Sequence, residues 1–236
     1  IAVEDYVQAV RDLGYAVVED VLGEAQVESL RQAFIEAEAV AAPRRSGSAL
    51  FAVRRALAIP AVRAEAESGT AARLAADVLG TEAKPVRAIL FDKNPEANWK
   101  VAWHQDQTIA VKERDEVEGF GPWSVKGGIV HVQPPAAVLE QMVTVRLHLD
   151  PCPAENGALR VLPGTHARGK LTPTSLTDIA QDVEPVTCAV GLGGAVLMRP
   201  LIVHGSSPSQ VAQHRRVVHI EYAASALPGG LTWAIA

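Results

Sequence analysis

The sequence predicts an α+β protein in which helices precede an antiparallel β-sandwich or jelly roll. Apolar residues recur at helical spacing in the first eighty residues, and from about residue 86 their period changes to two. Turn-forming pairs separate the alternating segments of this second part. Helices followed by many short strands are typical of the α+β class. No internal repeat or domain boundary is visible, so we expect one domain over residues 1–236.

The N-terminal part predicts three helices and one strand. The expected helices are 6–13, 27–34 and 71–79, and the expected strand is 15–18. Gly14 and Gly80 are placed to end the first and third helices, because glycine readily adopts the left-handed conformation of a helix C-terminus. Thr70 is the expected N-terminal cap of the third helix. We therefore expect residues 1–85 to form a mostly helical flank.

The part from residue 86 to residue 236 predicts the jelly-roll core. Its expected strands are 86–91, 128–132, 142–149, 158–162, 186–190, 195–198 and 217–222. A polar, glycine-rich stretch over residues 112–135 interrupts the strands and carries Phe120 and Trp123. We expect this stretch to be a lid that excludes water from a reactive site, the alternative being an ordinary long loop or an extra hairpin.

Composition excludes several classes of protein. The 236 residues are 48% hydrophobic and 21% charged, which is typical of a chain with a sizeable core rather than a disordered one. The net charge is −5 and no basic stripe occurs, so we expect no nucleic-acid partner. No apolar run is long enough for a membrane helix, and the chain opens without a secretory signal. The two cysteines lack CxxC spacing, so we expect a cytoplasmic protein without a disulfide scaffold.

A candidate metal site begins at the segment Trp103-His104-Gln105-Asp106. Residues two apart on an extended backbone project to the same side, so the side chains of His104 and Asp106 can converge on one point. An imidazole and a carboxylate are two of the three ligands in the facial triad of non-haem Fe(II) oxygenases. A solvated turn pair is the alternative interpretation of this short pattern.

The remaining parts of such a site occur far downstream. His204 ends an apolar segment and is followed directly by glycine, which makes it the candidate third ligand. Arg215 opens the last predicted strand. A 2-oxoglutarate co-substrate that chelates iron through its keto acid leaves a remote carboxylate, and arginine offers that group a planar and permanently charged partner. The His-x-Asp pattern, the distant His204 and Arg215 together indicate such a site more specifically than any one of them does.

Four stretches of the chain resemble the phytanoyl-CoA dioxygenase (PhyH) family of Fe(II)- and 2-oxoglutarate-dependent oxygenases. They are residues 14–20 (GYAVVED), 103–106 (WHQD), 155–166 (ENGALRVLPGTH), and 204–206 (HGS) with Arg215. The resemblance implies a double-stranded β-helix core with flanking helices. It also implies iron on His104, Asp106 and His204, the C5 carboxylate of 2-oxoglutarate on Arg215, and O₂ as the oxidant.

The predicted strand 142–149 has a polar face that can line the co-substrate site. Thr144, Arg146 and His148 alternate there with apolar residues. Relatives in the family often have a tryptophan where this chain has Arg146, so Arg146 either adds a polar contact or marks a remodelled pocket. We expect Arg146 and Thr144 to contact the co-substrate.

Further candidates for the site are less strongly specified. Lys93 can also face the co-substrate. Trp103, Phe120 and Trp123 are candidates for substrate contacts. The remaining histidines are expected to be structural or to lie at the surface; they are His131, His148, His166, His214 and His219.

The sequence thus predicts an Fe(II)- and 2-oxoglutarate-dependent hydroxylase of a small molecule, which releases succinate and CO₂. Halogenases related to the family have a small residue in place of the carboxylate ligand, so Asp106 predicts hydroxylation or desaturation rather than chlorination. Two alternatives remain: a cupin-like metal enzyme that does not use 2-oxoglutarate, and a non-catalytic jelly-roll binding module. Neither the substrate nor the oligomeric state can be inferred from these residues.

Overall fold

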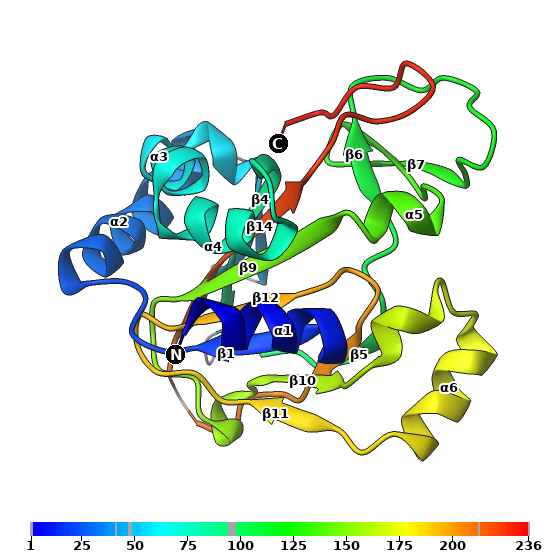
Figure 1. The fold of residues 1–236 in the computed structure, drawn as a ribbon. Coiled ribbons are helices and arrows are strands. Elements are labelled where there is room, and N and C mark those ends of the chain that lie inside the picture. The colour runs from blue at the N-terminus through cyan, green and yellow to red at the C-terminus, as the bar shows by residue number, and fades with distance from the viewer. Residues whose placement is uncertain (1, 41, 47–48, 94–97, 212, 236) are drawn as a thin grey trace.

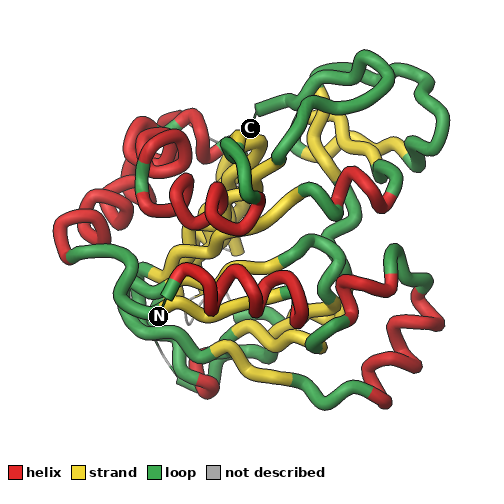
Figure 2. The backbone as a smooth tube through the Cα atoms, in the orientation of Figure 1, coloured by secondary structure: helices red, strands yellow, loops and turns green. Residues whose placement is uncertain are grey.

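Two antiparallel sheets form the body of the protein, and helices cover the outer face of the larger one (Figures 1 and 2). The computed structural model describes residues 2–40, 42–46, 49–93, 98–211 and 213–235. The larger sheet has the strand order β1-β12-β9-β14-β4-β3-β2, and the smaller has the order β11-β10-β13-β5. A third sheet has the order β6-β8-β7. This is the predicted α+β jelly roll with flanking helices.

The elements have the following bounds. The α-helices are α1 (Val3–Leu13), α2 (Glu24–Val40), α3 (Pro60–Ser68), α4 (Thr70–Leu79), α5 (Ala136–Leu139) and α6 (Pro173–Asp182), and the 3-10 helices are η1 (Ala56–Ala58), η2 (Ala154–Asn156) and η3 (Thr165–Arg168). The strands of the larger sheet are β1 (Tyr15–Val18), β2 (Ala42–Ser46), β3 (Ala49–Arg54), β4 (Lys84–Lys93), β9 (Met142–His148), β12 (Ala195–Met198) and β14 (Arg215–Ala223). The other strands are β5 (Val101–His104), β6 (Ile109–Val111), β7 (Trp123–Lys126), β8 (Ile129–Val132), β10 (Leu159–Leu162), β11 (Val186–Cys188) and β13 (Val203–Ser206).

The helix ends follow the local sequence, with one correction. Gly14 and Gly80 both adopt the left-handed conformation, with φ of 85° and 67°, and end α1 and α4 as predicted. The prediction that Thr70 caps α4 is wrong, because Gly69 is the N-cap and Thr70 is already helical. A carboxylate oxygen of Glu65 instead accepts the backbone N–H of Ala71 at 2.8 Å. A side chain from the preceding helix therefore satisfies a free amide at the start of α4.

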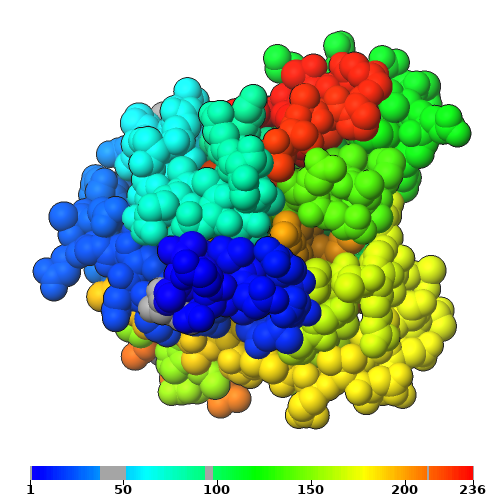
Figure 3. Space-filling view, in the orientation of Figure 1, coloured from blue at the N-terminus to red at the C-terminus, as the bar shows by residue number. Residues whose placement is uncertain are grey.

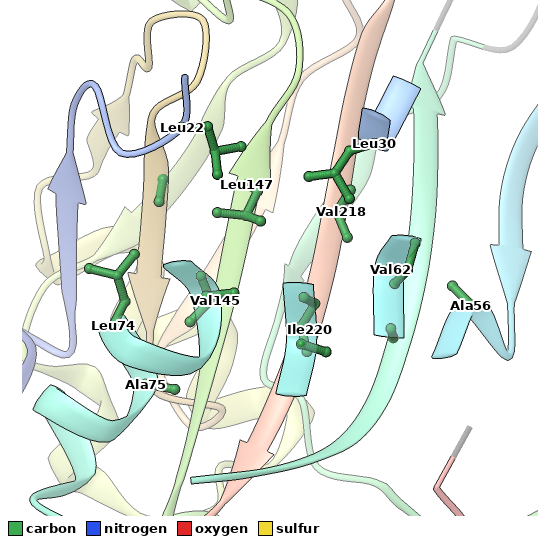
Figure 4. Packing of buried hydrophobic residues seen from close by; sticks show 14 of the residues in the cluster. Leu22, Leu30, Ala56, Val62, Leu74, Ala75, Val145, Leu147, Val218 and Ile220 are labelled. Carbon is green, nitrogen blue, oxygen red and sulfur yellow. The ribbon is translucent and has the colours of Figure 1, made fainter. Parts of the chain in front are cut away.

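The main core lies between the helices and the larger sheet (Figure 4). Leu30 and Leu74 from the helices pack with Val145, Leu147 and Ile220 from the sheet, and all five side chains are buried. The alternation along β9 and β14 sends one set of side chains into this core and the other set to the opposite face. The opposite face looks toward the smaller sheet, and its side chains are largely polar.

Several elements were not predicted. Helices α3 and α6, the hairpin β2–β3 and the strand β5 fall in segments without a clear period. Residues 112–135 contain the hairpin β7–β8, whose strand β8 also pairs with β6, and their expected function as a lid stays a prediction. The C-terminal segment lies beside this small sheet through backbone hydrogen bonds from Lys112 to Thr232 and from Ala234 to Ala110 (Figure 3). The extra hairpin, the alternative considered for these residues, is therefore what the structure contains.

Two expectations about composition can be compared with the described residues. Within them, no helix combines the length and the apolarity that crossing a bilayer demands. Cys152 and Cys188 are both buried as free thiols.

Candidate metal centre and its cavity

Two histidines and one aspartate converge between the two sheets. His104 ends β5 and lies directly opposite His204 of β13 in the antiparallel ladder, so their rings lie side by side with centroids 4.2 Å apart. Nε2 of His104 and Nε2 of His204 are each 3.6 Å from a carboxylate oxygen of Asp106. One ligand atom from each residue lies within 4.8 Å of the others, which is the arrangement that a single metal ion requires.

Backbone contacts fix the orientation of both imidazoles. Nδ1 of His104 lies 2.9 Å from the carbonyl oxygen of Ala102, and Nδ1 of His204 lies 2.9 Å from that of Ile202. A carbonyl only accepts, so each Nδ1 carries a proton, and each Nε2 faces Asp106 as the atom that would bind a metal. Histidine ligands of metals are commonly held in this way. The two Nε2 atoms and the carboxylate form a donor set that suits Fe(II).

Gln105 anchors the segment between the ligands, a role that sequence analysis did not predict. Its amide donates to the carbonyl oxygens of Gly169 and Leu201, at 2.8 and 2.7 Å, and its oxygen accepts from the N–H of Leu171. The backbone N–H of Asp106 also donates to the carbonyl of Pro200 at 2.9 Å. These bonds hold the end of β5 where His104 and Asp106 can face His204.

The charges at the centre also suit a divalent cation. Burial opposes ionisation of Asp106, but His204, His104 and His219 outweigh it and hold the pKa of this carboxyl well below its usual range. Burial lowers the pKa of His204 to about 4, so this imidazole is neutral at pH 7. A metal ion needs a deprotonated carboxylate and neutral imidazoles. Asp106 and His204 meet these conditions near neutral pH. At His104 burial opposes protonation, but the neighbouring Asp106 carboxylate outweighs it and raises the pKa of this imidazole, so a metal ion would compete with a proton there.

The centre opens into a cavity of about 120 Å³ between the sheets. Its lining combines the three ligands with basic, aromatic and small residues. These residues are Phe91, Trp99, Val101, His104, Asp106, Arg146, Leu159, His204, Gly205, Ser206, Arg215 and His219.

Arg215 and Lys93 form a basic end of this region. They are direct partners across β14 and β4, and both side chains are buried. Arg215 donates through Nη1 to the carbonyl oxygen of Gly157, and its Nε has no hydrogen-bond partner among the described residues. Nζ of Lys93 donates to the carbonyl of Ser207 at 3.0 Å and lies 3.4 Å from Oγ of Ser206. Burial, followed by the charge of Arg215, lowers the pKa of Lys93 to about 7.

Close backbone approach explains the glycine at this end. Gly157 has a φ of 66°, and a Cβ there would lie 2.6 Å from the carbonyl oxygen of Ser207. A side chain at this position would displace the loop that Lys93 binds. The Asn156-Gly157 pair therefore does more than form a turn.

Arg146 also lines the cavity, beside a histidine that sequence analysis did not assign to the site. Nη1 of Arg146 lies 2.8 Å from Nδ1 of His219, its partner across β9 and β14. Nε2 of His219 lies 3.3 Å from a carboxylate oxygen of Glu221. His219 was expected to be structural or at the surface, and only the pairing of β9 with β14 places it in the cavity.

Five predicted site residues lie outside the cavity lining, namely Lys93, which lies beside Arg215, and the four described next. Thr144 is buried on the same face of β9 as Arg146, so its contact with a co-substrate stays a prediction. Trp103 points to the other side of β5, where it packs against α6 and lies under Arg160 at 5.3 Å. Phe120 and Trp123 pack on a second hydrophobic cluster around β6 and β8. The structure therefore does not bring these three aromatic residues to the metal centre.

The other histidines make local contacts. Nε2 of His166 lies 3.0 Å from the carbonyl of Arg11, and His214 contacts Asp92. Nδ1 of His131 lies 2.9 Å from the carbonyl of Ile129. The imidazole of His148 is buried and hydrogen-bonds to none of the described residues, and burial holds its pKa well below the usual value. None of these four joins the metal centre in the described structure.

Fold and site together define a jelly-roll protein with a two-histidine, one-carboxylate facial metal site, the ligand set of non-haem iron oxygenases. The sequence model of the phytanoyl-CoA dioxygenase (PhyH) family matches residues 10–217, and the chain belongs to this family. No curated protein matches the sequence.

Several solved structures have a similar fold. AviO1 from Streptomyces viridochromogenes Tue57 has a TM-score of 0.69 at 22% identity, covering 96% of this chain and 97% of its own. The non-heme alpha ketoglutarate dependent epimerase SnoN from nogalamycin biosynthesis has a TM-score of 0.71 at 18% identity, covering 97% and 90%. EctD from S. alaskensis with 2-oxoglutarate and 5-hydroxyectoine has a TM-score of 0.71 at 19% identity, covering 95% and 76%. At these identities the likeness concerns the fold.

The geometry predicts that each of three substitutions removes Fe(II) binding while the protein stays folded. His104→Ala, Asp106→Ala and His204→Ala each delete one ligand, and we expect the affinity for Fe(II) to fall by more than about 100-fold, since even outer-shell partners are worth 10- to 100-fold. Anaerobic titration with Fe(II), with circular dichroism as a check on folding, measures this. His166→Ala is the control and should bind normally. Loss of binding in the control and retention in His204→Ala would refute the ligand assignment.

Proposed function

We propose that this chain is an Fe(II)- and 2-oxoglutarate-dependent oxygenase that hydroxylates a small-molecule substrate and releases succinate and CO₂. The observation that carries this proposal is a facial triad in a cavity whose other end holds the buried Arg215. Membership in the phytanoyl-CoA dioxygenase family supports it. So do structural neighbours described as alpha ketoglutarate dependent or bound to 2-oxoglutarate.

Metal binding and binding of the 2-oxoglutarate C5 carboxylate would take place at opposite ends of the cavity. His104, Asp106 and His204 would hold Fe(II) on one face and leave the opposite face for the keto acid and O₂. Bound iron would supply the oxidising chemistry, with 2-oxoglutarate as the source of electrons. Arg215 would bind the C5 carboxylate of 2-oxoglutarate through a charge-assisted contact in a buried setting. Lys93, beside it, would add a second positive charge.

Burial between the sheets serves this chemistry in two ways. It strengthens the attraction between Arg215 and a carboxylate, because few water molecules screen the pair. It also limits side reactions by excluding water from the metal. The function of residues 112–135 as a lid remains a prediction. In the structure these residues contain the hairpin β7–β8, which forms a small sheet together with β6.

A substrate screen tests the proposed reaction directly. Anaerobically reconstituted protein, exposed to O₂ with 2-oxoglutarate and a panel of small molecules, should release succinate in step with one hydroxylated product. Asp106→Ala is the control and should release none. Oxidised product without succinate would favour a cupin-like enzyme instead. Failure to bind Fe(II) at all would favour a binding module.

Arg215→Ala should raise the dissociation constant for 2-oxoglutarate about 10- to 100-fold and leave Fe(II) affinity nearly unchanged. The lost contact is charge-assisted, and such bonds are worth roughly 1.5–3 kcal/mol. Calorimetry on the anaerobic Fe(II)-loaded protein measures the effect. Arg216→Ala is the matched control, because Arg216 faces the other way and pairs with Asp150 at 2.7 Å. Equal losses in the two variants would show that the strand register is misassigned.

The affinity for 2-oxoglutarate should be highest below pH 7 and should fall as the pH rises through about 7. Only the protonated amine of Lys93 attracts a carboxylate, and the pKa of this amine is lowered to about 7 by burial and by Arg215. Lys93→Met keeps the apolar stem and removes the charge, so its affinity should be lower and should lack this decline. Calorimetry from pH 6 to 8.5 with saturating metal compares the two proteins. Parallel pH profiles would exclude Lys93 from the binding of the co-substrate.

A further inference from the structure

Arg146 brings a positive charge into the cavity and forms no ion pair with a carboxylate of the described residues; Asp106 attracts it only from a distance and is also the candidate metal ligand. Its Nη1 contacts the ring of His219, and its Nε is buried without a hydrogen-bond partner among the described residues. Burial, followed by the charge of Arg215, lowers the pKa of Arg146 to about 10, so the guanidinium remains charged at neutral pH. A buried charge without a counter-ion is costly. A bound anion would remove that cost.

A chain of contacts holds this guanidinium in place without neutralising it. A guanidinium only donates, so Nδ1 of His219 accepts, and its Nε2 carries the proton that faces Glu221. The carboxylate of Glu221 is already paired with Arg87, whose Nε lies 2.9 Å from the same oxygen. The ring of Phe91 lies 5.9 Å from the Arg146 guanidinium. The group is therefore oriented in advance, and the nearby carboxylate belongs to another cation.

In the proposed function, the charges of Fe(II) and of 2-oxoglutarate are balanced without Arg146. Fe(II) would be neutralised by Asp106 and by the keto-acid carboxylate that chelates it. The other carboxylate of 2-oxoglutarate would be matched by Arg215 with Lys93. Arg146 pairs in register with His219, four residues along β14 from Arg215, or roughly 13 Å of strand. The backbone of Arg146 therefore lies at a different position along the strands from that of Arg215, which would bind the C5 carboxylate.

We propose that Arg146 binds a carboxylate of the substrate, in place of the co-substrate contact expected from the sequence, so that the enzyme acts on small carboxylic acids. This inference rests on the proposed function, because the charge balance assumes that iron and 2-oxoglutarate occupy the cavity. With 2-oxoglutarate bound between the metal and Arg215, the substrate would reach Arg146 from the remaining open part of the cavity.

Paramagnetic NMR of simple acids tests the assignment without a known substrate. Protein loaded with Mn(II) and 2-oxoglutarate is mixed with butyrate or with the neutral butyramide, and broadening of the probe's proton signals reports binding close to the metal. We expect broadening of butyrate at least fivefold greater than that of butyramide. Arg146→Gln should abolish the difference, and Arg146→Lys, which keeps the charge, should retain part of it.

The affinity for 2-oxoglutarate, measured in the same samples, separates this inference from the proposed function. Arg146→Gln should change that affinity less than twofold, whereas Arg215→Ala should lower it at least tenfold. Arg160→Gln, which removes an arginine that lies over Trp103 outside the cavity, is the matched control and should alter neither measurement.

Three results would overturn the inference. Equal broadening of butyrate and butyramide would show that no carboxylate site exists. A loss of 2-oxoglutarate affinity in Arg146→Gln as large as that in Arg215→Ala would assign Arg146 to the co-substrate. A wild-type protein that binds Mn(II) but not 2-oxoglutarate would refute the proposed function and the inference together.

Discussion

The two central strands β9 and β14 bury both of their faces, and the site depends on the way they do so. One face packs Val145, Leu147 and Ile220 against the helices, which contributes the free energy of a large apolar contact. The same alternation sends Arg146, Arg215 and other polar side chains into the space between the sheets. Because a shift of one residue would exchange the two faces, the hydrophobic core fixes the register that places the basic groups.

The metal centre depends on a second pairing, between β5 and β13. These strands come from distant parts of the chain, and their ladder sets His104 opposite His204. The hydrogen bonds of Gln105 hold the segment that follows, so that Asp106 approaches both imidazoles. Ligands fixed by backbone pairing need little rearrangement when a metal binds, which favours binding.

The interior of the sandwich contains more fixed charge than a structural core would. Arg87 and Glu221 compensate each other, whereas Arg146, Arg215 and Lys93 have no carboxylate partner among the residues that line the cavity. Uncompensated burial lowers the stability of the empty protein. Such an arrangement is expected where anionic ligands complete the structure, and it distinguishes this cavity from a core whose polar groups are paired with one another.

The sequence by itself determined the fold class, most of the strands and the identity of the candidate ligands. Period-two alternation, the glycines at positions 14 and 80, and the stretches around His104, Asp106, His204 and Arg215 are local features, and local features can be seen in one sequence. The short strand β5 and helix α3 were missed, because their formation depends on neighbours rather than on their own pattern. Alternation along a strand, which is a local feature, already indicates that Trp103 points away from the side of its neighbour His104. Only the tertiary structure decided that His219 enters the cavity, because that depends on the pairing of β14 with β9.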